Sequence, residues 1–187
     1  MAFDLWARVE GGTCMYGDYR RPRKVETLLW TVTPITLAEP LTLAGRYSPN
    51  EPLTRVSHGE AKAIAVQLGA RLPTATEWEW AAAGPQDYPF PWGSDPWNPA
   101  RANLRDSDLG QSVVVGCYPE GNTKDGLMDM AGNVWEWTST LIPNGGAIIK
   151  GGSYNSTVLE ALTKFLNAAP VELQSPGIGF RLVKDLP

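Results

Sequence analysis

Gly132-Asn133-Val134-Trp135-Glu136-Trp137 (GNVWEW) is the most informative segment of this 187-residue chain. Its two tryptophans are typical of a core strand, since buried indole rings contribute large apolar areas. Three further motifs accompany it in a fixed order: RLPTATEWEW at 71–80, GGSY at 151–154 and GFR at 179–181. The eight Trp, 19 Gly and 16 Pro of the chain favour short strands, turns and long ordered loops over a helical bundle.

Length and composition indicate one domain, 1–187, since no linker or repeat divides the chain and 43% hydrophobic residues can fill a core. The net charge of −4 argues against a nucleic-acid partner, and the basic cluster at 20–24 is too small for such a face. No segment is apolar enough for membrane insertion, and the N-terminus lacks the pattern of a signal peptide. We therefore expect cytoplasmic synthesis, which is compatible with assembly into a virion. The sequence leaves the oligomeric state open.

Cysteine and histidine residues are scarce in this chain. Cys14 and Cys117 are the only cysteines, and two buried thiols are a simpler reading than a disulfide. The single histidine, His58, lies in a helix-start pattern and has no partner histidines for a metal site.

Local patterns predict several elements. Strands are expected at 5–9 and 25–32, and irregular backbone at 36–56. Capping boxes at 57–60 and 74–77 predict two helices that end near Gly69 and Gly84. A long loop should fill 85–112, with a short strand at 113–118 and core strands around Trp135, 148–150 and 180–183.

At these motifs the chain resembles the formylglycine-generating enzyme (sulfatase-modifying factor) family, a branch of the C-type lectin fold. The matching segments are 71–81, 90–93, 102–104, 126–138, 151–154 and 179–181. The resemblance implies an α+β domain with two helices, small antiparallel sheets, paired terminal strands and much irregular backbone. The N-terminal third matches only loosely.

The resemblance also argues against catalysis. Members that oxidise cysteine to formylglycine carry reactive cysteines shortly after the Gly-Gly-Ser motif, where this chain has Ser156 and Ala161. Neither side chain can replace a thiolate as nucleophile or copper ligand. Iron-dependent relatives need several histidines. We therefore expect no enzyme activity, no copper and no iron.

Variable proteins of diversity-generating retroelements share the scaffold, and in them the segment between the last two motifs is the diversified binding surface. Here that segment is 151–181. Its ligand would be a protein or surface group of unknown identity. The expected contact residues are Tyr154, Asn155, Ser156, Thr157, Leu159, Glu160, Leu162, Lys164, Phe165, Asn167, Gln174 and Ser175.

A competing interpretation concerns 157–168. Thr157 and Glu160 form a third capping-box pattern, and apolar residues follow at helical spacing. An amphipathic helix there would bury several of the expected contact residues. The resemblance instead implies a loop that enters a strand at Asn167.

Structural Ca²⁺ is a further expectation, because long loops need their polar backbone groups satisfied. One oxygen-rich set comprises Asn133 and Glu136, and a second comprises Asn103, Asp106 and Asp108. In the alternative interpretation, Asn133 caps a turn and Glu136 pairs with a cation.

The sequence thus favours a non-catalytic ligand-binding protein diversified by a retroelement. Two alternatives stay open: a formylglycine-generating-type oxidase with an altered or degenerate site, and a structural phage or accessory protein.

Overall fold

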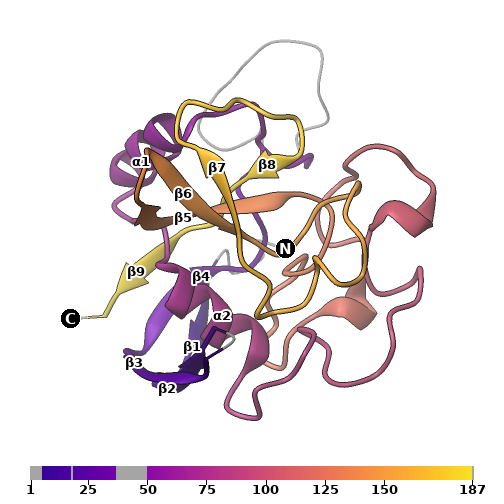
Figure 1. Ribbon diagram of the computed structural model, residues 1–187, viewed down its shortest axis with the longest axis horizontal. Helices are drawn as coiled ribbons and strands as arrows, with labels where there is room; N and C mark the ends of the chain where they lie inside the picture. Colours follow the sequence, from indigo (N-terminus) through magenta and orange to yellow (C-terminus); the bar gives the residue numbers. More distant parts are fainter. Residues whose placement is uncertain (1–5, 18, 37–49, 187) are drawn as a thin grey trace.

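The computed structural model describes residues 6–17, 19–36 and 50–186 (Figure 1). Two α-helices, two short 3-10 helices and nine strands alternate with long loops in these ranges. The strands are β1 (Trp6–Val9), β2 (Gly12–Tyr16), β3 (Arg21–Val25), β4 (Leu28–Thr31), β5 (Trp135–Ile142), β6 (Gly146–Lys150), β7 (Asn167–Pro170), β8 (Ile178–Gly179) and β9 (Val183–Asp185). The helices are α1 (His58–Gln67), α2 (Ala75–Ala83), η1 (Arg105–Ser107) and η2 (Pro119–Gly121).

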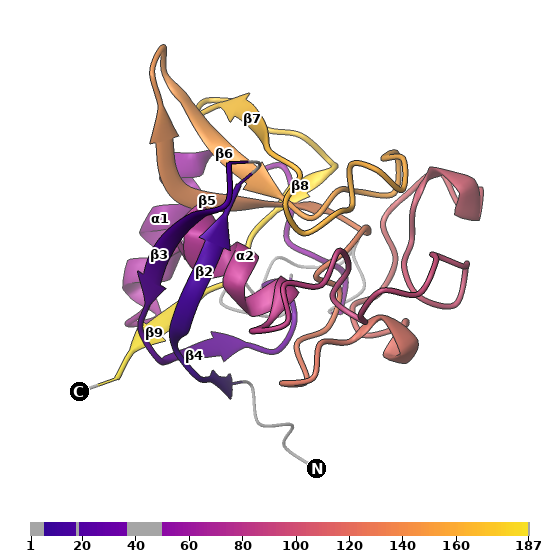
Figure 2. The same cartoon turned by 60° about the horizontal axis from the view of Figure 1, so that its bottom comes forward.

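The strands form three small sheets. β4 lies between β1 and β9 and is antiparallel to both, so strands from the two ends of the chain share one sheet (Figure 2). β2 and β3 form a two-stranded ribbon, and the third sheet has the order β7-β6-β5-β8. This arrangement confirms the α+β class. The terminal strands β1 and β9 share a sheet, but the expected pairing between them is wrong, because β4 lies between them.

Both predicted helices are confirmed, and each begins with the capping box that predicted it. The side chains of Ser57 and Thr74 accept from the N–H groups of Glu60 and Glu77, whose carboxylates bond back to the cap. These reciprocal bonds satisfy donors that the first turn of a helix leaves open. α2 ends at Gly84, which has φ of +64°.

Three strand predictions need correction. The described backbone at 113–118 contains no strand, because the N–H of Val113 bonds to the Asn133 side chain and that of Gly116 to Asp129. The segment predicted at 25–32 divides between β3 and β4. Residues 180–182 are buried but irregular, and the strand begins at Val183. Irregular backbone is predicted at 36–56, of which residues 37–49 lie outside the described residues. Leu5, at the start of the strand predicted at 5–9, lies outside them as well.

One buried carboxylate joins three of the four motifs. Glu136 accepts from Nε and Nη2 of Arg181 at 2.7 and 2.8 Å and from the Trp78 indole N–H at 2.6 Å. Glu136 and Arg181 are at most 1% exposed. A buried charge needs such charge-assisted hydrogen bonds to offset the loss of water. The GNVWEW, GFR and RLPTATEWEW motifs therefore meet at one point in the core.

No helix within the described ranges combines the length and the apolar content that a bilayer crossing requires.

Candidate ligand-binding site

The segment 151–181, called the binding segment below, leaves β6 through two glycines. Gly151 and Gly152 have φ of +95° and +79°, a region that side chains strongly disfavour. A Cβ atom on Gly151 would also lie 3.0 Å from the Met130 carbonyl oxygen. The Gly-Gly pair thus permits a close turn out of the sheet into the loop that follows.

The start of that loop is held by Arg105 from η1. The Arg105 backbone N–H donates to the Ser156 carbonyl, and its side-chain Nε donates to the Asn155 carbonyl, both at 3.0 Å. Both acceptors are main-chain oxygens, which every amino acid provides. Arg105 can therefore hold this backbone whatever side chain stands at 155.

The end of the loop is held in the same manner. The Thr163 N–H donates to the Pro89 carbonyl at 2.9 Å, and the Thr163 hydroxyl donates to the Tyr88 carbonyl at 2.7 Å. The buried ammonium of Lys150 donates to the Phe165 carbonyl at 3.0 Å. Residues 154–166, called the binding loop below, are thus fixed at both ends by the rest of the domain.

The helix considered for 157–168 does not form. Both the N–H and the hydroxyl of Thr157 donate to Glu160, as the capping-box pattern suggested. The N–H of Glu160, however, bonds to the carbonyl of Thr157 three residues back, and similar turns follow it. The N–H of Thr163 bonds outside the segment, to Pro89. The loop interpretation is confirmed, and β7 begins at Asn167 as the resemblance implied.

The twelve predicted contact residues differ in exposure. Asn155, Leu159 and Gln174 are exposed, and Leu159 retains 69% of its accessible surface. Seven are half-buried, and these are Thr157, Glu160, Leu162, Lys164, Phe165, Asn167 and Ser175.

Tyr154 and Ser156 are corrections, because both are buried. Ser156 is 3% exposed, and its hydroxyl accepts from the Ser153 N–H at 3.0 Å while its own N–H donates to the Ser153 carbonyl. Tyr154 is 9% exposed. The Ser156 hydroxyl stabilises the turn, and the burial of both side chains leaves little of their surface to a ligand.

Several half-buried residues have internal partners. Lys164 forms an ion pair with Asp87 at 2.6 Å, and Thr157 and Glu160 bond to each other. The Asn167 amide oxygen accepts from the N–H of Ala168. Substitution at these positions would remove a contact that shapes the loop.

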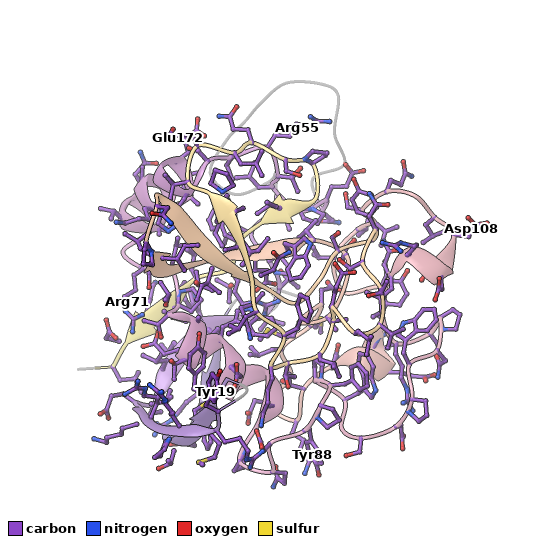
Figure 3. The ribbon with its side chains drawn as sticks, viewed as in Figure 1. Tyr19, Arg55, Arg71, Tyr88, Asp108 and Glu172 are labelled. Carbon is purple, nitrogen blue, oxygen red and sulfur yellow. The ribbon has the colours of Figure 1, made fainter. Side chains whose placement is uncertain are left out.

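Gln174 and Ser175 lie on a different part of the surface. Gln174 donates to Glu60 at the start of α1, and the Ser175 carbonyl accepts from the N–H of Arg55. Arg55 lies at the opposite end of the molecule from Tyr88, whose carbonyl binds the loop (Figure 3). The structure therefore divides the predicted contact residues between two regions.

The two positions at which catalytic cysteines are expected are nearly inaccessible to solvent. Ser156 and Ala161 are at most 3% exposed. Both cysteines of the chain are free thiols elsewhere. Cys14 is buried in β2, but Cys117 is exposed in a loop, so the expectation of two buried thiols is wrong for Cys117. Burial raises the pKa of the Cys14 thiol to about 12, which opposes thiolate formation.

At the first predicted metal site, the carboxylate oxygens of Glu136 already accept hydrogen bonds from Arg181 and Trp78. The structure therefore shows the alternative interpretation, in which Glu136 pairs with a cationic side chain. The Asn133 amide bonds to the N–H and carbonyl of Val113, as a turn-stabilising residue does.

The second predicted site fits a cation only in part. The buried amide oxygen of Asn103 has no hydrogen-bond partner, as a position for a hard cation would require. Asp106 and Asp108 are exposed. Among the described residues, no cluster of three or more His, Cys, Asp or Glu side chains could hold a metal.

Sequence reasoning missed Arg105, Asp87 and the buried pair of Glu79 and Lys150. The pair had a signal, since each charge interrupts an apolar run, and an isolated charge in such a run must find a buried partner. Arg105 and Asp87 lie in the long 85–112 loop, where no periodicity indicates a partner.

The model of the sulfatase-modifying factor enzyme 1-like domain matches residues 9–186, which is nearly the whole chain. The chain belongs to this family. Its α+β structure is the C-type lectin fold expected from the motifs.

Proteins with similar sequences include an enzyme and a protein named as inactive. Hercynine oxygenase of Mycolicibacterium thermoresistibile is 43% identical over 96 residues, covering 49% of this chain and 21% of that protein. Inactive C-alpha-formylglycine-generating enzyme 2 of Mus musculus is 36% identical over 121 residues, covering 57% of this chain and 38% of that protein. The alignment thus spans well under half the length of either relative.

Solved structures with the same fold include Treponema denticola variable protein 1, with a TM-score of 0.77, 17% identity, and coverage of 95% of this chain and 94% of that one. PvdO from Pseudomonas aeruginosa has a TM-score of 0.80 at 19% identity, covering 97% and 94%. The U1 variant of the major tropism determinant has a TM-score of 0.59 at 12% identity, covering 96% and 62%. At these identities the likeness shows the shared fold.

Proposed function

We propose that this chain is a non-catalytic ligand-binding protein whose binding segment, 151–181, is diversified by a retroelement. The main support for this proposal is the way in which the rest of the domain holds the binding loop. Arg105, Thr163 and Lys150 fix it mainly through main-chain atoms, while Asn155 and Leu159 point to solvent. A surface that must vary needs a backbone that does not depend on the varied side chains.

The chemistry of the site supports the same proposal. Serine and alanine stand at 156 and 161, where oxidising members carry thiols, and both side chains are buried. The free thiols at Cys14 and Cys117 lie outside the binding segment. Two structural neighbours are named a variable protein and a tropism determinant, which agrees with a role in recognition.

The ligand in this proposal is a protein or a surface-borne group. Exposed aliphatic and amide side chains, such as Leu159 and Asn155, offer apolar anchors and adaptable hydrogen bonds.

An oxidase with an altered site is the second candidate, favoured by the 43% identity to hercynine oxygenase. Purified chain would be incubated with a thiol peptide, oxygen and either copper or iron, and products followed by mass spectrometry. We expect unchanged peptide. Turnover above a metal-only control would favour the oxidase instead.

Sequencing the coding region from many isolates tests the diversification directly. We expect substitutions confined to residues 154–178 and frequent at the codons of exposed residues such as Asn155 and Leu159. A neighbouring template repeat and reverse-transcriptase gene should accompany them. Substitutions scattered evenly along the gene would refute the proposal.

Structural Ca²⁺ remains part of the proposal only near Asn103, whose buried amide oxygen lacks a hydrogen-bond partner. Thermal unfolding would be compared in CaCl₂, MgCl₂ and EDTA. A bound Ca²⁺ should raise the Tm in CaCl₂ alone, and the Asn103→Ala variant should lose that response. An identical Tm in all three solutions would exclude this site.

A further inference from the structure

The buried ion pair of Glu79 and Lys150 lies directly beneath the binding loop. Glu79 comes from α2 and Lys150 from the end of β6, their charged atoms are 3.1 Å apart, and both are at most 1% exposed. The pair reaches two further segments. Lys150 donates to the Phe165 carbonyl in the binding loop, and Glu79 accepts from the N–H of Gly17 just after β2, at 2.9 Å.

A second ion pair joins the same two segments at the surface. One oxygen of Asp87 binds both Lys164 of the binding loop, at 2.6 Å, and Arg20, at 2.5 Å. Arg20 itself is tied to Gly17, because its N–H donates to the Gly17 carbonyl at 3.0 Å. Gly17 and Arg20 are therefore connected to the 163–165 part of the loop twice, once in the core and once at the surface.

These contacts are built from charged groups. A buried ion pair loses much of its Coulombic gain to desolvation, so it is weak evidence for a role in stability alone. The contacts of the two ion pairs are directional, however. The buried pair bonds to Gly17 and to the Phe165 carbonyl, and Asp87 binds Arg20 and Lys164. Such geometry is suited to fixing loop position.

We propose that Glu79, Lys150 and Asp87 are positioning residues that fix the 163–165 part of the binding loop relative to Gly17 and Arg20 in one rigid unit. The significance of this unit rests on the proposed function, because a loop fixed before binding loses less conformational freedom on meeting its ligand. The buried pair of Glu79 and Lys150 lies outside the binding segment, so diversification would leave it unchanged. The surface connection lasts only where Lys164 is retained.

Hydrogen–deuterium exchange of the full chain tests this without any ligand. The variants are Asp87→Asn and the double substitution of Glu79→Gln with Lys150→Met, which avoids an unpaired buried charge. We expect exchange at the amides of Thr163, Phe165 and Arg20 to rise about tenfold in each, as local opening becomes easier.

Two controls distinguish a local rise in amide exchange from a global loss of stability. Asp95→Asn breaks an exposed ion pair with Arg101 in the same long loop, and should change neither segment. The amides of β5 report global stability. Unchanged exchange at 163–165 in both variants, or an equal rise in β5, would overturn the proposal. Because no ligand is involved, this outcome is independent of whether the binding segment is diversified.

Discussion

Glu136 shows how much of the fold depends on one side chain. Its carboxylate binds the Arg181 guanidinium and the Trp78 indole, and all three groups are buried. Removing its charge would leave Arg181 as an uncompensated buried cation, and such a change costs far more than the loss of a surface pair.

We predict that Glu136→Gln lowers the free energy of unfolding by about 3–5 kcal/mol. Urea denaturation followed by tryptophan fluorescence would measure it. The matched control is Asp95→Asn, which breaks an exposed pair with Arg101 and should leave the midpoint nearly unchanged. Equal effects of the two substitutions would contradict the importance assigned to the buried carboxylate.

Asp129 predicts a pH dependence. Burial raises the pKa of its carboxyl to about 6, against the N–H bond from Gly116, which lowers it. The folded state therefore binds the proton more tightly than the unfolded chain. Its contribution to stability is full below the unfolded pKa near 4 and is lost as the pH rises through about 6.

The Asp129→Asn variant cannot ionise, so it should gain stability relative to the wild type as the pH rises from 4 to 7. The expected gain is on the order of 2 kcal/mol, given 1.36 kcal/mol per unit of pKa difference. Parallel urea midpoints at four pH values would measure it. A constant difference between the two proteins across this range would show that the Asp129 carboxyl has the same pKa in the folded and unfolded states.

At the scale of elements, similar local patterns produce different structures. The capping boxes at Ser57 and Thr74 begin helices, whereas the one at Thr157 forms its hydrogen bonds but no helix follows. The difference is tertiary. The N–H of Thr163 bonds to Pro89 in a distant loop, and the intervening turns bond at a spacing of three residues. A sequence window cannot show that competing partner, so only the family resemblance predicted the loop.

Within the loop, exposure should separate tolerant from intolerant positions. We predict that Leu159→Ser changes the free energy of unfolding by no more than about 0.5 kcal/mol, as exposed substitutions usually do. Thr163→Ala should cost about 1–3 kcal/mol, because the half-buried Tyr88 carbonyl loses its donor and the buried position of Thr163 loses its hydroxyl bond. Thermal and urea unfolding of both variants would measure the two changes in the free energy of unfolding. A larger cost at Leu159 would mean that this side chain supports the loop.

At the scale of the whole molecule, the four motifs were sufficient to predict the fold, because each supplies a residue to the shared core or a glycine to a required turn. They did not predict which loop residues face solvent. Tyr154 and Ser156 are buried because Ser153 and the glycines before it direct the chain inward. That direction depends on Met130 and Asn133, which the sequence places far away.

In the proposed function, a fixed domain carries a loop surface whose side chains are free to change. Two displayed libraries test it, one randomised at Asn155, Leu159 and Leu166, which are exposed, and one at Ser153, Ser156 and Ala161, which are buried. The measurement is the fraction of members that resist protease, followed by selection on an unrelated folded protein. We predict that most of the exposed library stays folded and yields binders, whereas most of the buried library is degraded. Equal survival of the two libraries, or no binders from the exposed one, would contradict the claim.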